Sequence, residues 1–101
     1  TEPAEKTIVP AAECTDMREV RAAIDSLDTL IVSLLAERMR YIEAAARIKP
    51  DRGAVRDEVR KAQVIAHAVK VADDRGSRLY DMLVEGSIAH EFDRFDELRK
   101  D

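Results

Sequence analysis

The stretch VRAAIDSLDTLIVSLLAERMRYIEAAARIK, residues 20–49, decides the fold of this chain. Its apolar residues recur at alternating steps of three and four, which is the spacing of one packed face of a helix. Thr15 or Asp16 offers an N-cap before it, and Pro50 ends it, because proline disfavours helical geometry at the preceding residue. The predicted helix therefore has about 34 residues and a length of about 50 Å.

A helix of this length is longer than a compact monomer of 101 residues needs, since such a domain has a radius of gyration of about 13 Å. Its apolar stripe is buried best against another chain. The composition, with 46% hydrophobic and 38% charged residues but few aromatics, favours helices over sheet. We therefore expect an all-α fold with three helices per chain, in which the long first helices build an intertwined homodimer.

Two shorter helices complete the predicted domain. The second begins near Ala54 or Val55, and it is expected to bury the face formed by Val55, Val59, Ala62, Ala66 and Val69. The sequence DDRGS, residues 73–77, interrupts the helical pattern. The third helix is predicted to run from about Arg78 to Leu98.

The first residues of the chain have a different character. Residues 1–14 contain Pro3 and Pro10 and no helical periodicity, so they are predicted to form a flexible arm before a helical domain at residues 15–101. The arm lacks the basic start and the apolar run of a secretion signal, and no run of about 18 uncharged apolar residues follows. These features favour a cytoplasmic protein that does not associate with membranes.

Charge and cysteine content narrow the classes of partner and cofactor. The net charge of -4, without a segregated basic patch, argues against nucleic acid or an anionic membrane surface as a partner. Cys14 is the only cysteine, which excludes an internal disulfide and leaves no second thiol for a metal or redox motif. We expect neither a metal nor a cofactor.

Two basic residues fall on the stripe of the first helix that should be buried. The three-four pattern continues from Leu34 to Arg38, and Lys49 returns to within about 20° of the same face. In one interpretation both side chains snorkel, with their stems packed on apolar surface and their charged ends in water. In the other they project into a buried site.

The third helix repeats this anomaly with an acid. Ser87 and Glu91 are spaced i, i+4 and point into its apolar arc. Burial there disfavours an ionised carboxylate unless a cation or a ligand compensates its charge. Glu91 therefore predicts either a structural salt bridge to a basic residue of the first helix or a place in a ligand site.

The position of Arg21 indicates that a second chain contributes to the site. It lies about 25 Å from Arg38 along one helix, so a single chain cannot bring both to one small ligand. In an antiparallel pairing of two long helices, Arg21 of one chain approaches the Arg38 and Lys49 region of the other, which gives two sites per dimer. Arginine forks suit carboxylates, so two arginines, a lysine and a carboxyl group predict a small dicarboxylate ligand.

These residues resemble a known family. Residues 20–49 resemble the first helix of the all-helical chorismate mutases, with an arginine near its start, LD after it, LLAER in the middle and a final lysine. VRDEVR, residues 55–60, resembles the start of their second helix, and VEGSIAHE, residues 84–91, the catalytic part of their third. ECT, residues 13–15, resembles the lead-in of the bacterial isochorismate pyruvate lyases, which share the fold. The resemblance extends from residue 13 to about residue 98.

The resemblance implies how the substrate carboxylates are bound. Arg38 and Arg60, with Arg21 of the neighbouring chain, would bind the two carboxylates of chorismate. Ser87 falls where a hydroxyl helps to hold a carboxylate, and Asp57 falls where the backbone and carboxylate meet the ring hydroxyl.

The resemblance also implies the catalytic groups. Lys49 would donate to the ether oxygen whose C–O bond breaks, and Glu91 occupies the position of the second donor, which is glutamine in many members. Chorismate to prephenate is an intramolecular pericyclic rearrangement, which requires no nucleophile, metal or cofactor. The expected activity is therefore that of a chorismate mutase acting by positioning and by electrostatic stabilisation of the ether oxygen.

Two features of the sequence depart from the family pattern. Lys61 stands where many mutases have a glutamate that contacts the ring hydroxyl, and the link DDRGSR is shorter than the family's usual link between the second and third helices.

The nearest rival function is that of an isochorismate pyruvate lyase, which would use the same cations to eliminate pyruvate and leave salicylate. The rival from another class is a non-catalytic helical dimerisation module whose buried cations form structural salt bridges.

Overall fold

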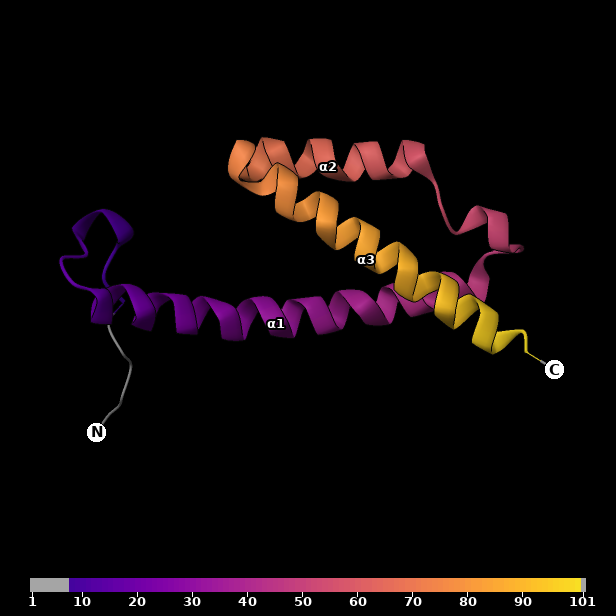
Figure 1. Ribbon diagram of the computed structural model, residues 1–101, viewed down its shortest axis with the longest axis horizontal. Helices are drawn as coiled ribbons and strands as arrows, with labels where there is room; N and C mark the ends of the chain where they lie inside the picture. The colour runs from indigo at the N-terminus through magenta and orange to yellow at the C-terminus, as the bar shows by residue number, and fades with distance from the viewer. Residues whose placement is uncertain (1–7, 101) are drawn as a thin grey trace. The chain divides into compact units, whose positions relative to one another are not determined.

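The computed structural model describes residues 8–100, and the regular elements among them are helices (Figure 1). Short 3-10 turns at Ala11–Glu13 and Arg52–Ala54 accompany three α-helices, which are α1 (Met17–Ile48), α2 (Glu58–Ala72) and α3 (Asp74–Leu98). The prediction of an all-α fold with three helices and a long first helix is confirmed. Of the predicted arm, residues 1–7 lie outside the described residues.

The chain packs as two compact units, Thr1–Glu37 and Arg38–Asp101, and α1 runs through both. The part of α1 in the first unit has its apolar stripe exposed, with exposed fractions of 48% for Ile24, 55% for Leu27 and 49% for Ile31. The second unit contains the end of α1 together with α2 and α3. The hydrophobic core and the candidate site both belong to this second unit.

The start of α1 is capped as the sequence predicts. The Asp16 Oδ1 atom accepts a hydrogen bond of 2.9 Å from the backbone N–H of Glu19. The Glu19 carboxylate in turn accepts from the backbone N–H of Thr15 at 2.8 Å and from its hydroxyl at 3.1 Å. This reciprocal arrangement satisfies N–H groups that have no partner inside the helix.

The end of α1 is held by a side chain from the end of α3. Pro50 stops the helix, which leaves carbonyl groups of the last turn without helical partners. Arg99 donates from Nη1 to the carbonyl of Ala46 at 3.1 Å and from Nη2 to that of Lys49 at 2.8 Å. The Arg99 guanidinium also stacks on the Phe95 ring, with 3.6 Å between its carbon and the ring centroid. Lys49 is thereby fixed through its backbone.

The predicted start of the second helix was wrong by several residues. α2 begins at Glu58, because Asp57 has extended backbone angles (φ -124, ψ 100) and its side chain accepts from the backbone N–H of Arg60 at 2.9 Å. Residues 52–54 form a separate 3-10 turn that Asp51 caps. Asp57 is therefore the N-cap of α2 and not an interior residue.

The predicted start of the third helix was also wrong, because the break between α2 and α3 is a single residue. α3 begins at Asp74, and Asp73 reverses the chain with φ 51 and ψ -149. Gly76 permits this tight corner, since a Cβ there would lie 3.2 Å from the Ala72 Cβ and 3.3 Å from the Ala68 carbonyl oxygen. The glycine that signals a break in the sequence is a helical residue at a close approach of two helices.

Asp73 provides a stability prediction. Its backbone region favours glycine and costs other residues about 1–3 kcal/mol, whereas glycine in place of an N-cap residue costs only a few tenths. We expect Asp73→Gly to raise the free energy of unfolding by about 1 kcal/mol. Asp73→Ala should lower it by a similar amount, because alanine keeps the strain and loses the cap to Arg75 N–H at 3.1 Å. Chemical denaturation of the three proteins measures both changes, and equal destabilisation by glycine and alanine would contradict the strain.

The core of the second unit is small. It consists of the buried residues Ala46, Val55, Val84, Ile88 and Phe95, with Val64, Tyr80 and Phe92 packed around them. α2 runs into the corner at Asp73 and α3 runs back out of it towards the same side, so the two helices are antiparallel in chain direction and pack on each other (Figure 1). Between these helices and the end of α1, the core leaves room for polar side chains.

The face of the second helix predicted to be buried was wrong at three of its five residues, whereas Val55 is buried in the core just before α2. Val59 is 71% exposed, and Ala62 and Ala66 are exposed as well. The inward side of the helix instead carries Val64, which packs on the core, and Ala68, which is buried. Because α2 has apolar residues on both sides, helical periodicity does not decide which side faces α3.

Candidate active site

A cavity of about 340 Å³ lies in the second unit, with walls from the end of α1, the start of α2 and the middle of α3. Its apolar wall is formed by Ile42, Ala45, Val55, Val64, Val84 and Ile88. Its polar wall is formed by Arg38, Lys49, Asp57, Arg60, Lys61, Ser87 and Glu91. Six of the seven residues named from the sequence therefore lie around one cavity. The seventh, Arg21, is exposed on α1 and is not among the residues that line the cavity.

Arg38 lies half-buried and its guanidinium is oriented by α3. Its Nη1 donates to the Ser87 Oγ at 2.7 Å, and its guanidinium carbon is 5.8 Å from the centroid of the Tyr80 ring. The Ser87 hydroxyl donates in turn to the carbonyl of Leu83 at 2.7 Å. Ser87 is 3% exposed, so this chain of hydrogen bonds directs the guanidinium into the cavity wall.

Lys49 and Glu91 meet inside the cavity. The Lys49 Nζ lies 2.7 Å from the Glu91 Oε2, and it also donates to the Val55 carbonyl at 3.4 Å. The side chain of Glu91 is 5% exposed and that of Lys49 is 28% exposed. Oε2 makes this ion-pair contact but accepts no hydrogen bond from any described residue. This contact is the salt bridge to a basic residue of the predicted first helix, which was one of the two interpretations of Glu91.

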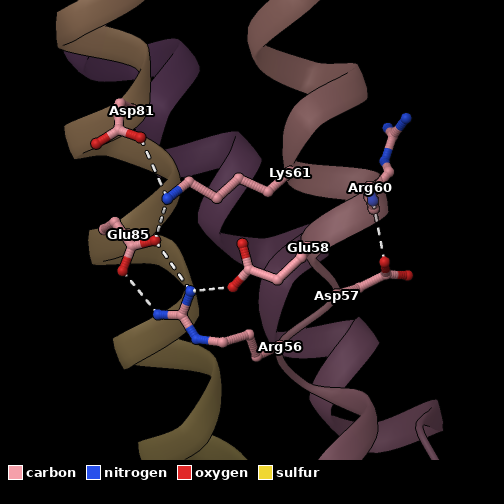
Figure 2. A network of polar contacts seen from close by, with 7 residues as sticks. All are labelled: Arg56, Asp57, Glu58, Arg60, Lys61, Asp81 and Glu85. Atoms are coloured by element: carbon pink, nitrogen blue, oxygen red, sulfur yellow. Dashed lines mark hydrogen bonds and ion pairs between the residues drawn. The ribbon is translucent and has the colours of Figure 1, made fainter.

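Asp57 and Arg60 bring the first turn of α2 to the cavity. The Asp57 carboxylate is engaged as the N-cap, through the hydrogen bond from the Arg60 N–H, and both residues are exposed. In Figure 2 the Arg60 side chain extends away from the neighbouring ion pairs. Its guanidinium therefore takes no part in those ion pairs, and Arg60 is among the residues that line the cavity.

Lys61 also lines the cavity, but acids of α3 hold its ammonium group. Its Nζ contacts the Glu85 carboxylate and lies 3.2 Å from the Asp81 Oδ1 (Figure 2). The Glu85 carboxylate also accepts two hydrogen bonds from Arg56, one from Nη2 at 2.7 Å and one from Nη1 at 3.1 Å. Arg56 has a second partner in Glu58, at 2.8 Å.

This network changes the ionisation of its members. The hydrogen bonds from Arg56 and then from Lys61 lower the pKa of Glu85 to about 2. The hydrogen bond to Glu85, followed by that to Asp81, raises the pKa of Lys61, and Glu85 raises that of Arg56. A lowered carboxyl pKa contributes stability that is present above its ordinary value of 4.5 and is lost as the pH falls towards about 2. The network is therefore fully charged at neutral pH.

The charges around the cavity define what it can hold. Four cationic and two acidic side chains line it, which leaves an excess of two positive charges when all are ionised. An apolar wall surrounds these charges, so a small dianion with a hydrophobic ring would match the cavity in both charge and surface.

Among residues 8–100 we find no cluster of His, Cys, Asp and Glu side chains able to ligate a metal. Nor does any helix there combine the length and apolarity needed to cross a membrane.

Sequence reasoning missed the residues that support the site. Glu85, Asp81 and Arg56 hold Lys61 and the start of α2, and Arg99 holds the end of α1. These partners are far apart in the sequence and lie on charged helix surfaces, where most residues of the same kind face only solvent. Stretches of one helix give no local signal for such pairs.

Comparison with known proteins identifies the family. The family model of chorismate mutase type II matches residues 20–92, which is most of the chain. The isochorismate pyruvate lyase of Pseudomonas aeruginosa is 35% identical over 64 residues. That alignment covers 63% of this chain and 63% of the length of the lyase. The match includes the end of α1, the start of α2 and the part of α3 that line the cavity, and the chain belongs to the chorismate mutase type II family.

Proposed function

We propose that this protein is a chorismate mutase, which rearranges chorismate to prephenate in the cavity described above. The observation that carries this proposal is the meeting of Lys49 and Glu91 at 2.7 Å in a partly apolar cavity with an excess of positive charge. Chorismate has two carboxylates and a ring, which suits such a cavity. Membership of the family supports the same activity.

Each cavity residue has a proposed task. Arg38 and Arg60 bind substrate carboxylates, and the Ser87 hydroxyl keeps the Arg38 guanidinium in place. Lys49 donates to the ether oxygen, and Asp57 at the head of α2 meets the ring hydroxyl. The residues that bind the carboxylates act on both the bound substrate and the transition state. Lys49 acts mainly on the transition state, because the ether oxygen gains its charge there.

The reaction breaks the ether C–O bond and forms a C–C bond within one molecule, with no proton transfer and no covalent intermediate. The protein therefore has two tasks. It holds the flexible enolpyruvyl ether in a compact chair, and it stabilises the negative charge that grows on the ether oxygen. Lys49 Nζ and the Glu91 carboxyl reach the same point in the cavity, as two donors to one oxygen must.

Glu91 makes the expected activity depend on pH. A carboxyl group donates a hydrogen bond only when protonated, so if Glu91 must donate to the ether oxygen, activity should be lost wherever Glu91 is ionised. An amide donates at every pH. We expect Glu91→Gln to keep kcat/KM within about tenfold at neutral pH and to remove the dependence on pH that a carboxyl donor would cause. Initial rates of prephenate formation between about pH 5 and pH 9 measure both profiles.

Two outcomes separate the donor role from a structural one. A wild-type kcat/KM that stays constant over this range would argue against a protonated Glu91. Loss of activity in Glu91→Gln at every pH would show that the charge of Glu91, paired with Lys49, is what the site needs.

We also propose that a second copy of the chain covers the apolar stripe of α1 and contributes Arg21 to the cavity. The stripe is exposed over the first unit, and Leu34 at its end is 60% exposed. An apolar helix face of this length is a typical interface between chains. Two-fold symmetry would then give two equivalent sites.

A second candidate activity is that of an isochorismate pyruvate lyase. It is favoured by the curated relative from Pseudomonas aeruginosa, whose name gives that activity. Isochorismate carries the same enolpyruvyl ether and the same two carboxylates, so the cations of the cavity suit both substrates. The products differ, because the lyase releases pyruvate and leaves salicylate.

One experiment distinguishes these activities. Purified protein is incubated separately with chorismate and with isochorismate, and prephenate, salicylate and pyruvate are followed by chromatography. We expect prephenate from chorismate. Salicylate with pyruvate as the dominant products would favour the lyase, and turnover of neither substrate would favour a non-catalytic helical dimerisation module.

A further inference from the structure

The start of α2 carries two proposed ligand contacts, Asp57 and Arg60, and the residues on either side of this pair are tied to α3. Arg56 immediately precedes Asp57, and Lys61 immediately follows Arg60. Figure 2 shows the side chains of Arg56 and Lys61 converging on Glu85 of α3. Both ends of the ligand-binding turn are thus attached to one carboxylate.

Within the turn itself, residues 57–60, apolar packing is weak, and the packed residues Val55 and Val64 lie on either side of it. Val59, its apolar residue, is 71% exposed. Among residues 8–100, the side-chain hydrogen bonds and ion pairs that link residues 56–61 to α3 all end on Glu85 or Asp81. Glu85 accepts from both Arg56 nitrogens as well as from Lys61, so it carries most of these links. A bidentate arginine contact within a network of several charges is the arrangement in which partly exposed ion pairs do constrain geometry.

Glu85 itself does not line the cavity. It lies on α3 two residues before Ser87, about 200° around the helix, and its side chain is 38% exposed. Ser87 and Glu91 point into the cavity, whereas Glu85 faces the start of α2. It therefore acts on a ligand only through the residues that it holds.

We infer that Glu85 is a positioning residue, which fixes the wall formed by Asp57 and Arg60 relative to the wall formed by Ser87 and Glu91. This inference rests on the proposed function. Lys49 is held by other contacts, from Val55 and Arg99, and Glu91 is paired with Lys49. Loss of Glu85 should therefore weaken binding of the substrate more than it slows the rearrangement of bound substrate.

The test compares Glu85→Ala with Glu58→Gln in the full chain. Glu58 is the other partner of Arg56, but it lies on α2 and does not link that helix to α3. We expect Glu85→Ala to raise KM about tenfold and to leave kcat within about threefold, since this substitution removes charge-assisted hydrogen bonds that position the binding wall. Glu58→Gln should leave both constants close to those of the wild type. If Glu85→Ala does not fold, Glu85→Gln, which removes the charge but keeps the shape, replaces it.

Two further measurements do not depend on turnover. Amide hydrogen exchange at residues 61–64 should be about tenfold faster in Glu85→Ala than in the wild type and unchanged in Glu58→Gln. Calorimetric titration with prephenate, a dicarboxylate probe, should show a dissociation constant raised about tenfold in Glu85→Ala.

The outcomes separate this inference from the proposed function. A wild type that turns over neither substrate would argue against the function, and hydrogen exchange would still decide whether Glu85 holds the start of α2. Unchanged KM together with unchanged exchange in Glu85→Ala would overturn the positioning role. A lowered kcat with an unchanged KM would overturn it as well.

Discussion

Lys49→Ala is expected to lower kcat/KM for chorismate by about 10³-fold, mostly through kcat. In the proposed mechanism Lys49 is the cation at the point where charge grows on the ether oxygen, and removal of one such preorganised donor costs about 10²–10³ in kcat in other enzymes. Its Nζ has two partners, Glu91 Oε2 and the Val55 carbonyl, which keep it aimed into the cavity. Steady-state kinetics with chorismate measure the loss, and near-normal turnover would contradict the assignment of the site.

Folding must be separated from catalysis in this variant. Lys49→Ala leaves the buried Glu91 without its cation, which is expected to lower the free energy of unfolding by about 2 kcal/mol. The double variant with Glu91→Gln removes the uncompensated charge and should recover most of this stability. It should not recover activity, because the catalytic cation is still missing.

The Lys49→Ala variant also tests whether Arg21 of a second chain contributes to the site. If Arg21 acts in the site of the partner, Arg21→Ala and Lys49→Ala are each nearly inactive alone. A mixed dimer then contains one site with both residues intact. Random re-association of equal amounts should restore about a quarter of the wild-type activity. Absence of any recovery in dimers shown to have exchanged subunits would place Arg21 outside the partner's site.

Arg38→Ala is expected to lower kcat/KM by about 10³-fold as well, with KM raised and kcat lowered. Arg38 offers a bidentate donor fork to a carboxylate, and its orientation depends on the Ser87 Oγ at 2.7 Å and on the Tyr80 ring. Loss of both the charge and the fixed geometry affects the ground state and the transition state. Kinetics with chorismate and titration with prephenate measure the two contributions.

Two variants serve as controls for Arg38. Arg47 lies on the same helix, is exposed and does not line the cavity, so Arg47→Ala should retain wild-type activity. Arg38→Lys keeps the charge but loses the planar fork, and it should remain at least about tenfold below the wild type. Equal losses in Arg38→Ala and Arg47→Ala would indicate a general effect of charge and would contradict a specific contact.

The sequence predicted the parts of this protein that depend on local pattern. Periodicity along α1 placed Arg38 on the side that faces the cavity, and the spacing of Ser87 and Glu91 placed both on the buried side of α3. Capping chemistry predicted Thr15 or Asp16 as the N-cap of α1, and the Asp16 side chain caps the helix. The same rules missed the starts of α2 and α3, because an extended Asp57 and a one-residue reversal at Asp73 are set by how the helices pack.

The sequence by itself determined an all-helical chain, the family to which it belongs, and the cations and acid that line one cavity. Tertiary structure alone decided which of those groups are paired. Lys49 faces Glu91, Ser87 orients Arg38, and Glu85 gathers the residues beside Asp57 and Arg60. The physical reason is that a helix presents its side chains by local geometry, whereas an ion pair between helices depends on their separation and rotation, which packing of the whole unit sets.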